Sequence, residues 1–235
     1  MKKLILFDID GTLILMKRTA QRAIMEYACN YALGYSVPTS AIPPLSGKTD
    51  RQIIEEILVN IGASSENNEQ IVSNFLEGLR IATPIHSTPA TITMLDGVRE
   101  LIEFLHIHQD ITLGLLTGNN RECAYFKLMP IDLDKYFTFG AFGCDHHDRR
   151  KLPPIAIQRG NLLVPNRPFS NSTTLIIGDA PGDISCAKAN SIPVLAVATG
   201  LFTEQELSQN GADAVINNFS DVDATISSIK KLLLL

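Results

Sequence analysis

The sequence predicts an α/β fold in which a doubly wound parallel sheet is wrapped by helices and an all-helical segment is inserted after the first strand. From Leu95 onward, amphipathic helical patterns alternate with short apolar runs, and such alternation is typical of parallel sheets. Between the first apolar run and Ala82, helical patterns follow one another with no strand between them. The helical segment is therefore predicted to separate the first strand from the rest of the sheet.

The composition narrows the classes of partner. The 235 residues suffice for one large domain or two unequal ones. The net charge of −5 gives no basic excess for nucleic acid or an anionic membrane, and no stretch approaches the roughly 20 apolar residues of a membrane helix. Small solutes are the expected partners. The four scattered cysteines predict reduced thiols and a cytoplasmic location, while the oligomeric state is left open.

Two acids follow the first predicted strand. The apolar run Leu4–Phe7 leads into the sequence DIDGT, so two carboxylates stand at the carboxyl end of a buried strand, where catalytic groups tend to lie. Because strand side chains alternate with period two, Asp8 and Asp10 are expected to point to one side. Gly11 allows a sharp turn there, and Thr12 is suited to cap it.

The inserted segment is predicted to contain three amphipathic helices. Apolar residues recur at helical spacing around Ile24, Ile57 and Phe75, and Thr49 with Gln52 forms a capping-box pair that opens the second helix. The stretch from Thr83 to Thr91 is broken by prolines and is suited to a linker. We therefore expect an α/β core of residues 1–14 and 92–235, and a helical unit of residues 15–91.

The second half of the chain supplies the other strands and helices. They are expected, in order, as a helix over Val98–His106, a strand from Ile111, a helix from Arg121, strands at Phe137 and Leu175, a helix from Pro181, a strand at Val194 and a final helix.

Two of these later strands also end in polar residues. Thr117-Gly118-Asn119 follows the strand that starts at Ile111, and a run with Asp179 and Asp183 follows the strand at Leu175. If the sheet forms as predicted, Asp8, Asp10, Asp179 and Asp183 converge at the ends of neighbouring strands. Each pair of carboxylates about 4 Å apart repels by roughly 4 kcal/mol at an effective dielectric constant of 20, so the cluster requires a cation. Its few hard oxygen ligands suit Mg²⁺.

The order of these groups resembles the haloacid dehalogenase-like hydrolase superfamily. The motifs of that superfamily are DxDGT, a strand-end Ser or Thr, a Lys or Arg, and GDxxxD, and the first and fourth match here without a gap. The stretch from Leu113 to Ile157 is most similar to phosphoglycolate phosphatase-type members. The resemblance implies a Rossmann-like core and a helical cap that closes over the active site.

The resemblance also implies roles for individual residues. The metal ion is expected to be bound by Asp8, the backbone carbonyl of Asp10 and Asp179, with Asp183 holding a ligand water. Asp8 is then the nucleophile that forms an aspartyl-phosphate, and Asp10 is the general acid and later the base.

Several groups are candidates for binding the substrate's charges. The Thr117 hydroxyl and the amides of Gly118 and Asn119 are expected to donate to the phosphoryl oxygens. In the basic run Arg149-Arg150-Lys151, the third residue matches the superfamily cation by its position relative to the following prolines, with Arg149 and Arg150 as alternatives.

In the helical unit, Lys48 and Arg51 flank a helix start. They are candidates to contact an anionic part of the substrate. A helix cap with solvated charges is the alternative interpretation.

The sequence therefore predicts a Mg²⁺-dependent phosphatase that hydrolyses a small, phosphoglycolate-like phosphate monoester. A phosphomutase of the same superfamily is the nearest alternative, because both reactions use the same groups. A phosphoacceptor signalling module or a non-catalytic phospholigand-binding protein is less well supported, since the first is about half this length and the second does not need two intact acids at the first strand.

Overall fold

The computed structural model describes residues 2–63, 68–166 and 168–234. Over these ranges the main sheet has six parallel strands in the order β5-β4-β1-β6-β7-β8. In chain order their bounds are β1 Lys3–Phe7, β4 Ile111–Leu116, β5 Gly140–Ala141, β6 Thr174–Gly178, β7 Val194–Val197 and β8 Ala214–Ile216.

This strand order confirms the predicted Rossmann-like sheet. From β1 the chain moves outward through β4 to β5, then crosses back to β6 on the other side of β1 and continues outward. The direction of winding therefore reverses between β1 and β6. Ligands of such sheets lie beyond the carboxyl ends of the strands at this reversal, which is where the predicted acids begin.

Helices cover both faces of the sheet, as the alternation of helices and strands predicted. Ile5 and Phe7 of β1 belong to a hydrophobic cluster with α4 and α9, whereas Leu4 and Leu6 belong to a cluster with α6 and α7 on the opposite face. No helix in the described ranges is long and apolar enough to cross a membrane. The helices of the core are α4 Val98–Ile107, α5 Arg121–Leu128, α6 Leu152–Leu163, α7 Pro181–Ala189, α8 Glu204–Gln209 and α9 Val222–Leu233.

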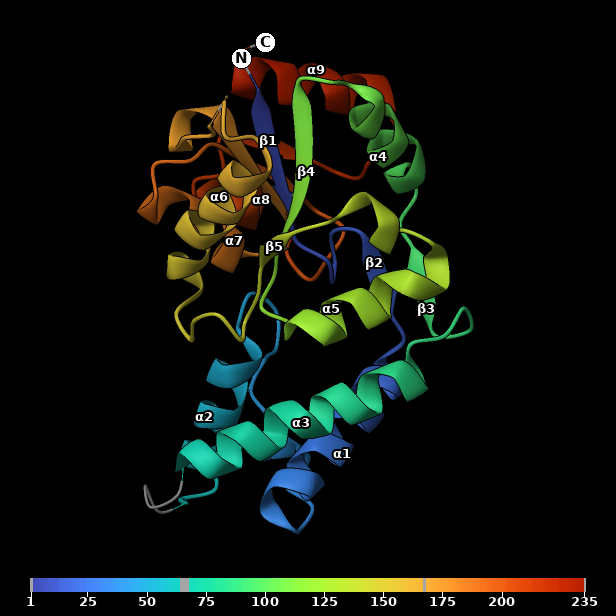
Figure 1. The fold of residues 1–235 in the computed structure, drawn as a ribbon. Helices are drawn as coiled ribbons and strands as arrows, with labels where there is room; N and C mark the ends of the chain where they lie inside the picture. Colours follow the sequence, from blue (N-terminus) through green and yellow to red (C-terminus); the bar gives the residue numbers. More distant parts are fainter. Residues whose placement is uncertain (1, 64–67, 167, 235) are drawn as a thin grey trace.

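Three further helices, α1 Arg18–Leu33, α2 Asp50–Asn60 and α3 Asn68–His86, lie together at the end of the molecule toward which β1 and β4 run (Figure 1). They share a third hydrophobic cluster that includes Ile24, Ile54 and Phe75. Helices α1 and α3 approach closely at Gly78, where a Cβ atom would lie 2.8 Å from the Cα of Ala28. The three helices thus have a core of their own.

The two crossings between the sheet and these helices run side by side. Strand β2, Ile14–Met16, pairs antiparallel with β3, Ile92–Met94, a ribbon that the sequence did not predict. The expected linker from Thr83 to Thr91 is also shorter than predicted, because α3 continues through Pro84 to His86. Proline removes only one backbone donor near the end of the helix.

The strand expected at Phe137 is displaced. The sheet strand is β5, Gly140–Ala141, and Phe137 precedes it. Phe137 is buried and packs edge-on against Phe7, with 6.0 Å between ring centroids. Its aromatic character therefore reports a position in the core rather than a place in the sheet.

Candidate active site

Three neighbouring strands deliver the predicted site residues to one edge of the sheet. Asp8 follows β1, Thr117 follows β4 and Asp179 follows β6, and β1 is hydrogen bonded to both of the other strands. The amide of Asp8 still donates to the carbonyl of Ile177, at 2.9 Å. The position of Asp8 is thereby fixed by the ladder between β1 and β6.

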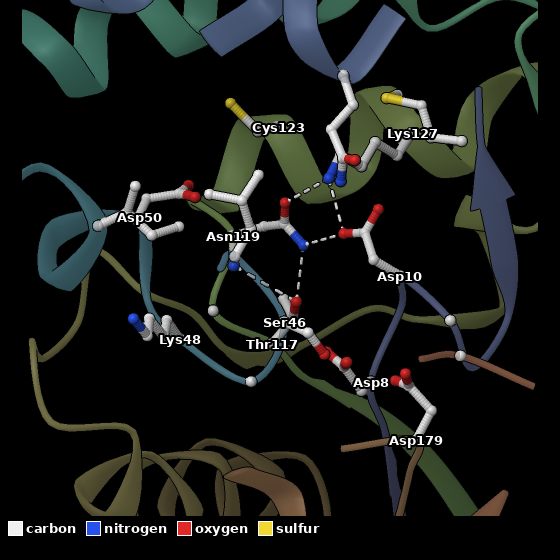
Figure 2. A pocket seen from close by; sticks show the side chains of 18 of the residues that line it. Asp8, Asp10, Ser46, Lys48, Asp50, Thr117, Asn119, Cys123, Lys127 and Asp179 are labelled. Carbon is white, nitrogen blue, oxygen red and sulfur yellow. Dashed lines mark hydrogen bonds and ion pairs between the residues drawn. The ribbon is translucent and has the colours of Figure 1, made fainter. Parts of the chain in front are cut away.

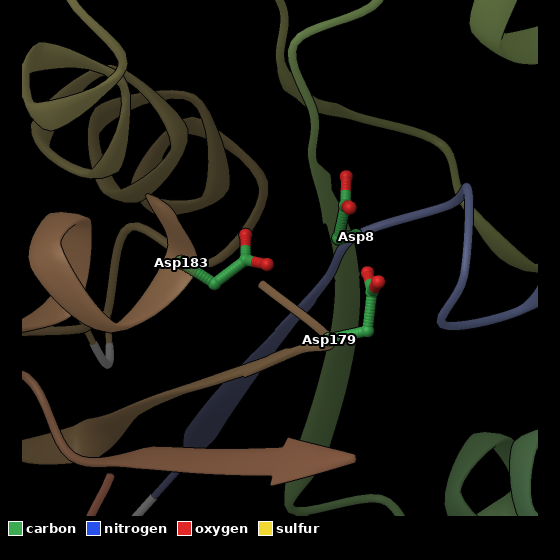
Figure 3. Close-up of side chains that lie close together, drawn as sticks. All are labelled: Asp8, Asp179 and Asp183. Atoms are coloured by element: carbon green, nitrogen blue, oxygen red, sulfur yellow. The ribbon is translucent and has the colours of Figure 1, made fainter. Parts of the chain in front are cut away.

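Asp8, Asp179 and Asp183 form a buried carboxylate cluster (Figure 3). One oxygen from each lies within 4.8 Å of the others. Desolvation by burial, together with the charge of Asp8, raises the pKa of Asp179 above its ordinary value. Desolvation likewise raises the pKa of Asp183, against the opposing effect of Arg149. Burial and the neighbouring carboxylates therefore disfavour the charged forms of Asp179 and Asp183.

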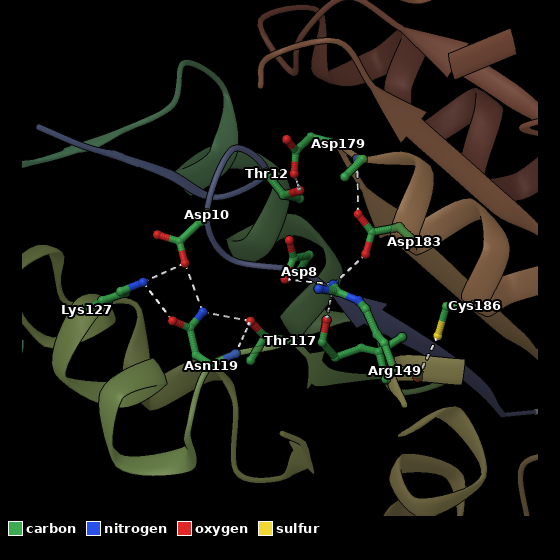
Figure 4. A network of polar contacts seen from close by, with 12 residues as sticks. Asp8, Asp10, Thr12, Thr117, Asn119, Lys127, Arg149, Asp179, Asp183 and Cys186 are labelled. Atoms are coloured by element: carbon green, nitrogen blue, oxygen red, sulfur yellow. Dashed lines mark hydrogen bonds and ion pairs between the residues drawn. The ribbon is translucent and has the colours of Figure 1, made fainter. Parts of the chain in front are cut away.

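The side chain of Asp10 does not join this cluster, which corrects the expectation that four carboxylates converge. Strand β1 ends at Phe7, and Asp10 lies in the following turn, where Gly11 has a φ of +85°. The alternation of strand side chains stops with the strand, so Asp8 and Asp10 face different partners (Figure 4).

The turn after Asp10 packs directly on Asp179. A Cβ atom on Gly11 would lie 2.3 Å from Oδ2 of Asp179, so the turn requires glycine on steric as well as conformational grounds. The hydroxyl of Thr12 donates to Oδ1 of Asp179 at 3.2 Å. Thr12 thus holds a carboxylate of the cluster.

Arg149 is the cation that the structure brings to the cluster. Its Nη2 lies 2.5 Å from Oδ1 of Asp183 and 3.1 Å from Oδ1 of Asp8. It also donates to the carbonyl of Leu116 at 3.2 Å. The side chain is only 6% exposed, so its charge acts at close range.

Lys151, the cation expected from the position of the prolines, is exposed and does not line the cavity at the strand ends. Arg150 is also exposed and pairs with Asp148. The three basic residues form a 3₁₀ turn, Arg149–Lys151. With about three residues per turn, successive side chains point in different directions, and only the first points inward.

Lys127 of α5 is a site residue that the sequence analysis missed. Its Nζ donates to Oδ2 of Asp10 at 2.6 Å and to Oδ1 of Asn119 at 2.7 Å. Burial alone would lower the pKa of Lys127. The charge of Asp10 and its hydrogen bond raise this pKa by more than burial lowers it, so the net shift is upward. A signal was present in the sequence, because this lysine lies on the buried stripe of α5 with Cys123 and Ala124.

Asn119 connects Asp10 to Thr117. Its Nδ2 donates to Oδ2 of Asp10 and to the hydroxyl of Thr117, both at 2.8 Å. Oδ2 of Asp10 therefore accepts from both Lys127 and Asn119. Oδ1 of Asp10 is buried and has no hydrogen-bond partner among the described residues.

The start of α2 docks on the loops at the strand ends. The amide of Asp50 donates to the carbonyl of Gly118 at 2.8 Å, and Oδ2 of Asp50 accepts from the amide of Asn120 at 2.6 Å. A Cβ atom on Gly118 would lie 1.8 Å from the carbonyl oxygen of Lys48. Thr49 caps α2 as predicted, accepting from the amide of Gln52. The helical segment therefore covers the strand ends.

The two cations expected in the helical segment are both paired. Lys48 lines the cavity, and its Nζ donates to Glu56. Arg51 pairs with Glu55 and Glu69 and does not line the cavity. The structure thus brings only Lys48 of this pair toward the strand ends.

Comparison with known proteins identifies the family. The sequence profile of haloacid dehalogenase-like hydrolases matches residues 5–197. The chain belongs to the haloacid dehalogenase-like hydrolase family. The match spans most of the chain, from β1 through the helical segment to β7, and confirms the predicted resemblance.

Curated relatives of this hydrolase carry the name phosphoglycolate phosphatase. One from Vibrio parahaemolyticus is 25% identical over 228 residues, which cover 94% of each chain. One from Photorhabdus laumondii is 24% identical over 118 residues, which cover 50% of this chain and 48% of the relative. Both matches support the phosphoglycolate phosphatase type of the resemblance.

Solved structures share the fold at lower identity. A β-phosphoglucomutase from Clostridium difficile has a TM-score of 0.71 at 16% identity and covers 100% of this chain and 98% of its own. A predicted phosphatase from Clostridium acetobutylicum has a TM-score of 0.69 at 17% identity, covering 97% and 99% of the two chains. At these identities the likeness shows the fold alone.

The carboxylate cluster of this hydrolase fits a divalent metal ion. The donors are hard oxygens and they are buried, and burial together with the neighbouring carboxylates raises the pKa of Asp179 and Asp183, so a cation would stabilise the charged cluster. Arg149 supplies positive charge to Asp8 and Asp183, whereas among the described residues the side chain of Asp179 accepts a hydrogen bond from the hydroxyl of Thr12 and has no ion pair.

Proposed function

We propose that the chain is a Mg²⁺-dependent phosphatase that hydrolyses a small phosphate monoester through an aspartyl-phosphate on Asp8. The observation that supports this most directly is the position of Asp8. Its carboxylate belongs to the cluster of acids, touches Arg149 and lines a cavity of about 500 Å³ between the sheet and the helical segment. The family and the names of the curated relatives point to the same reaction, with a phosphoglycolate-like ester as the first substrate to test.

In the first step, Asp8 attacks phosphorus and the bond to the leaving oxygen breaks. Arg149 lies 3.1 Å from Asp8, and Thr117 lines the same cavity; both would hold the phosphoryl oxygens as charge shifts onto them. Gly118 and Asn119 also line this cavity. Their amides remain our predicted donors to the phosphoryl group.

Asp10 is the proposed proton donor and acceptor. Its Oδ1 is the oxygen without a protein partner, whereas Oδ2 is held by Lys127 and Asn119. Oδ1 would protonate the leaving alkoxide and then accept the proton of the water that attacks the aspartyl-phosphate. Lys127 and Asn119 keep this carboxylate in one orientation through both steps.

The residues proposed to hold Mg²⁺ are Asp8, the backbone carbonyl of Asp10 and Asp179, with Asp183 holding a ligand water. When bound, the ion would supply positive charge between the carboxylates and the phosphoryl oxygens. A cytoplasmic place of action remains a prediction from the free cysteines.

The test is hydrolysis of an aryl phosphate by the full chain with Mg²⁺. Asp8→Asn is expected to abolish turnover, and a chelator is expected to abolish it reversibly, because Asn is no nucleophile and the carboxylates repel one another without an ion. Asp223→Asn is the matched control, since Asp223 is an exposed acid on α9. Undiminished turnover by Asp8→Asn, or in excess chelator, would contradict the proposal.

A phosphomutase remains the alternative, and the products distinguish it. A phosphatase releases inorganic phosphate from a sugar phosphate, whereas a mutase returns an isomeric sugar phosphate with little free phosphate. The aspartyl-phosphate on Asp8 is common to both, so the Asp8→Asn variant does not separate them.

A further inference from the structure

The cavity above Asp8 extends well beyond the space around the carboxylates. It has a volume of about 500 Å³, which is ample for a ligand with an organic group larger than two carbons. The part of the cavity on the side of the helical segment is lined by residues of α1, α2, α3 and α5, and we call it the apolar chamber. These residues include Ile24, Met25, Ile53, Leu79 and Cys123.

The apolar chamber is the side of the helices' own core that faces the cavity. All five of its named residues belong to the hydrophobic cluster shared by α1, α2 and α3, so this wall of the cavity is apolar, although polar residues line the cavity elsewhere. Figure 2 shows Cys123 and Lys127 of α5 on the side of the cavity that faces the helical segment, with Asp8 and Asp179 on the opposite side. A phosphate monoester whose phosphorus lies beside Asp8 therefore has room for its organic group on the side of the chamber.

The cations inside the cavity are already neutralised. Lys48 donates to Glu56, and Lys127 lies 2.6 Å from Asp10. Arg149 is bonded to Asp183 and Asp8. Lys48 and Lys127 already have carboxylate partners, and Arg149 is the cation proposed above to hold the phosphoryl oxygens, so none of the three is left for a second negative charge on the substrate.

Two other charged residues line the cavity. Asp50 adds a further carboxylate to the wall, and burial raises its pKa to about 6. Arg18 is the remaining cation that lines the cavity, but it is exposed to solvent on the first turn of α1. The inner cavity therefore disfavours an anionic organic group.

The apolar chamber and the paired cations each affect which organic group the cavity can bind. A carboxylate placed against the apolar chamber would lose its water without gaining a cation, which is unfavourable. An alkyl or aryl group would lose contact with water, which is favourable in proportion to its area. The first effect selects against phosphoglycolate, and the second favours a longer, uncharged ester.

We propose that the substrate is a phosphate monoester whose organic group is uncharged and largely apolar, and that this group fills the apolar chamber formed by α1, α2, α3 and α5. The inference rests on the proposed phosphatase activity and specifies its substrate class. It departs from the expectation that Lys48 selects an anionic leaving group.

The first experiment compares ethyl, butyl and hexyl phosphate with phosphoglycolate, using the full chain and Mg²⁺. The three alcohols are similar leaving groups, so differences in kcat/KM among the alkyl phosphates report how well the protein binds the alkyl group. We expect kcat/KM to rise about fourfold per methylene until the chamber is filled, and hexyl phosphate to exceed phosphoglycolate. A flat alkyl series, or phosphoglycolate as the best substrate, would overturn the inference.

The second experiment changes a residue that lines the apolar chamber. Met25→Gln keeps the length of the side chain but places an amide in the chamber, and it is expected to lower the hexyl-to-ethyl ratio of kcat/KM about tenfold. The ratio is measured within one preparation, so a loss of folded protein cancels. Met129→Gln is the matched control, because Met129 is 53% exposed and lies outside the cavity. An unchanged ratio in Met25→Gln would contradict the inference.

Lys48→Ala and Arg18→Ala test the competing explanation. We expect each to change kcat/KM for hexyl phosphate and phosphoglycolate by the same factor. A selective loss with phosphoglycolate would show that a cation reads a carboxylate, and would overturn the inference.

The two proposals fail in different ways. If the chain hydrolyses no monoester, the phosphatase proposal fails and this inference fails with it. If it hydrolyses phosphoglycolate best and Asp8→Asn abolishes that turnover, only the substrate class is wrong.

Discussion

Lys127→Met is the substitution that most directly tests how the site is built. The lysine is 11% exposed and its ammonium lies 2.6 Å from Oδ2 of Asp10, whose side chain is 30% exposed. Methionine keeps most of the side-chain length and removes the charge. The carboxylate of Asp10 then retains Asn119 as its one described side-chain partner.

The loss of stability can be estimated from this geometry. Removing one partner of a fully buried ion pair costs about 3–5 kcal/mol. Because Asp10 is partly exposed, water can solvate it in the variant, and we expect about 2 kcal/mol. For a chain of this size, that loss lowers Tm by roughly 4–8 °C.

The kinetic effect of Lys127→Met should reflect impaired proton transfer by Asp10 and not impaired attack by Asp8. A carboxylate that is no longer held in one orientation transfers protons less efficiently, and we expect kcat to fall about 10- to 100-fold. Alkyl phosphates need a protonated leaving group more than aryl phosphates do, so the loss should be larger for alkyl substrates.

A double-mutant cycle provides the decisive assay. In the Asp10→Asn background, itself expected to be about 10²–10⁴-fold slower, Lys127→Met should cause little further loss, because the residue that it positions is already changed. Lys135→Met is the matched control, since Lys135 is 51% exposed and pairs with Asp132. Losses that multiply, or that are equal for alkyl and aryl esters, would refute the positioning role.

Two further predictions concern the cation and the pH dependence. Arg149→Met should abolish activity and lower the free energy of unfolding by about 3–5 kcal/mol, since it leaves buried acids uncompensated. Lys151→Met should change the free energy of unfolding by less than about 0.5 kcal/mol. Measurements of kcat and chemical denaturation test both variants, and equal effects would contradict the assignment of Arg149. Asp50 has a folded pKa of about 6, above its unfolded value of about 3.9, so the stability linked to its protonation is fully present below about pH 4 and is lost as pH rises through 6. Asp50→Asn should therefore match the parent near pH 4 and exceed it at pH 7 by up to about 3 kcal/mol, and a difference in Tm that does not vary with pH would argue against this explanation.

The sequence by itself determined the parallel sheet and the residues at its strand ends. Apolar runs such as Leu4–Phe7 predicted buried strands, which the structure confirms for β1, and the motifs that follow them are contiguous along the chain. Because parallel strands present their carboxyl ends at one edge, the approach of Asp8 to Asp179 followed from local patterns alone.

Tertiary structure decided which side chains face one another across the site. The direction of Asp10 depends on where β1 ends, and that end is set by pairing with β4 and β6. Arg149, not Lys151, reaches Asp8 because a single 3₁₀ turn fixes which member of a basic run points inward.

The partner of Lys127 and the shape of the apolar chamber lay beyond sequence reasoning for a similar reason. The partner of Lys127 is more than a hundred residues away in the chain, at Asp10, and the chamber is shared by four separate helices. Periodicity identifies the buried face of each helix, but the gap left where several such faces meet depends on how the helices pack.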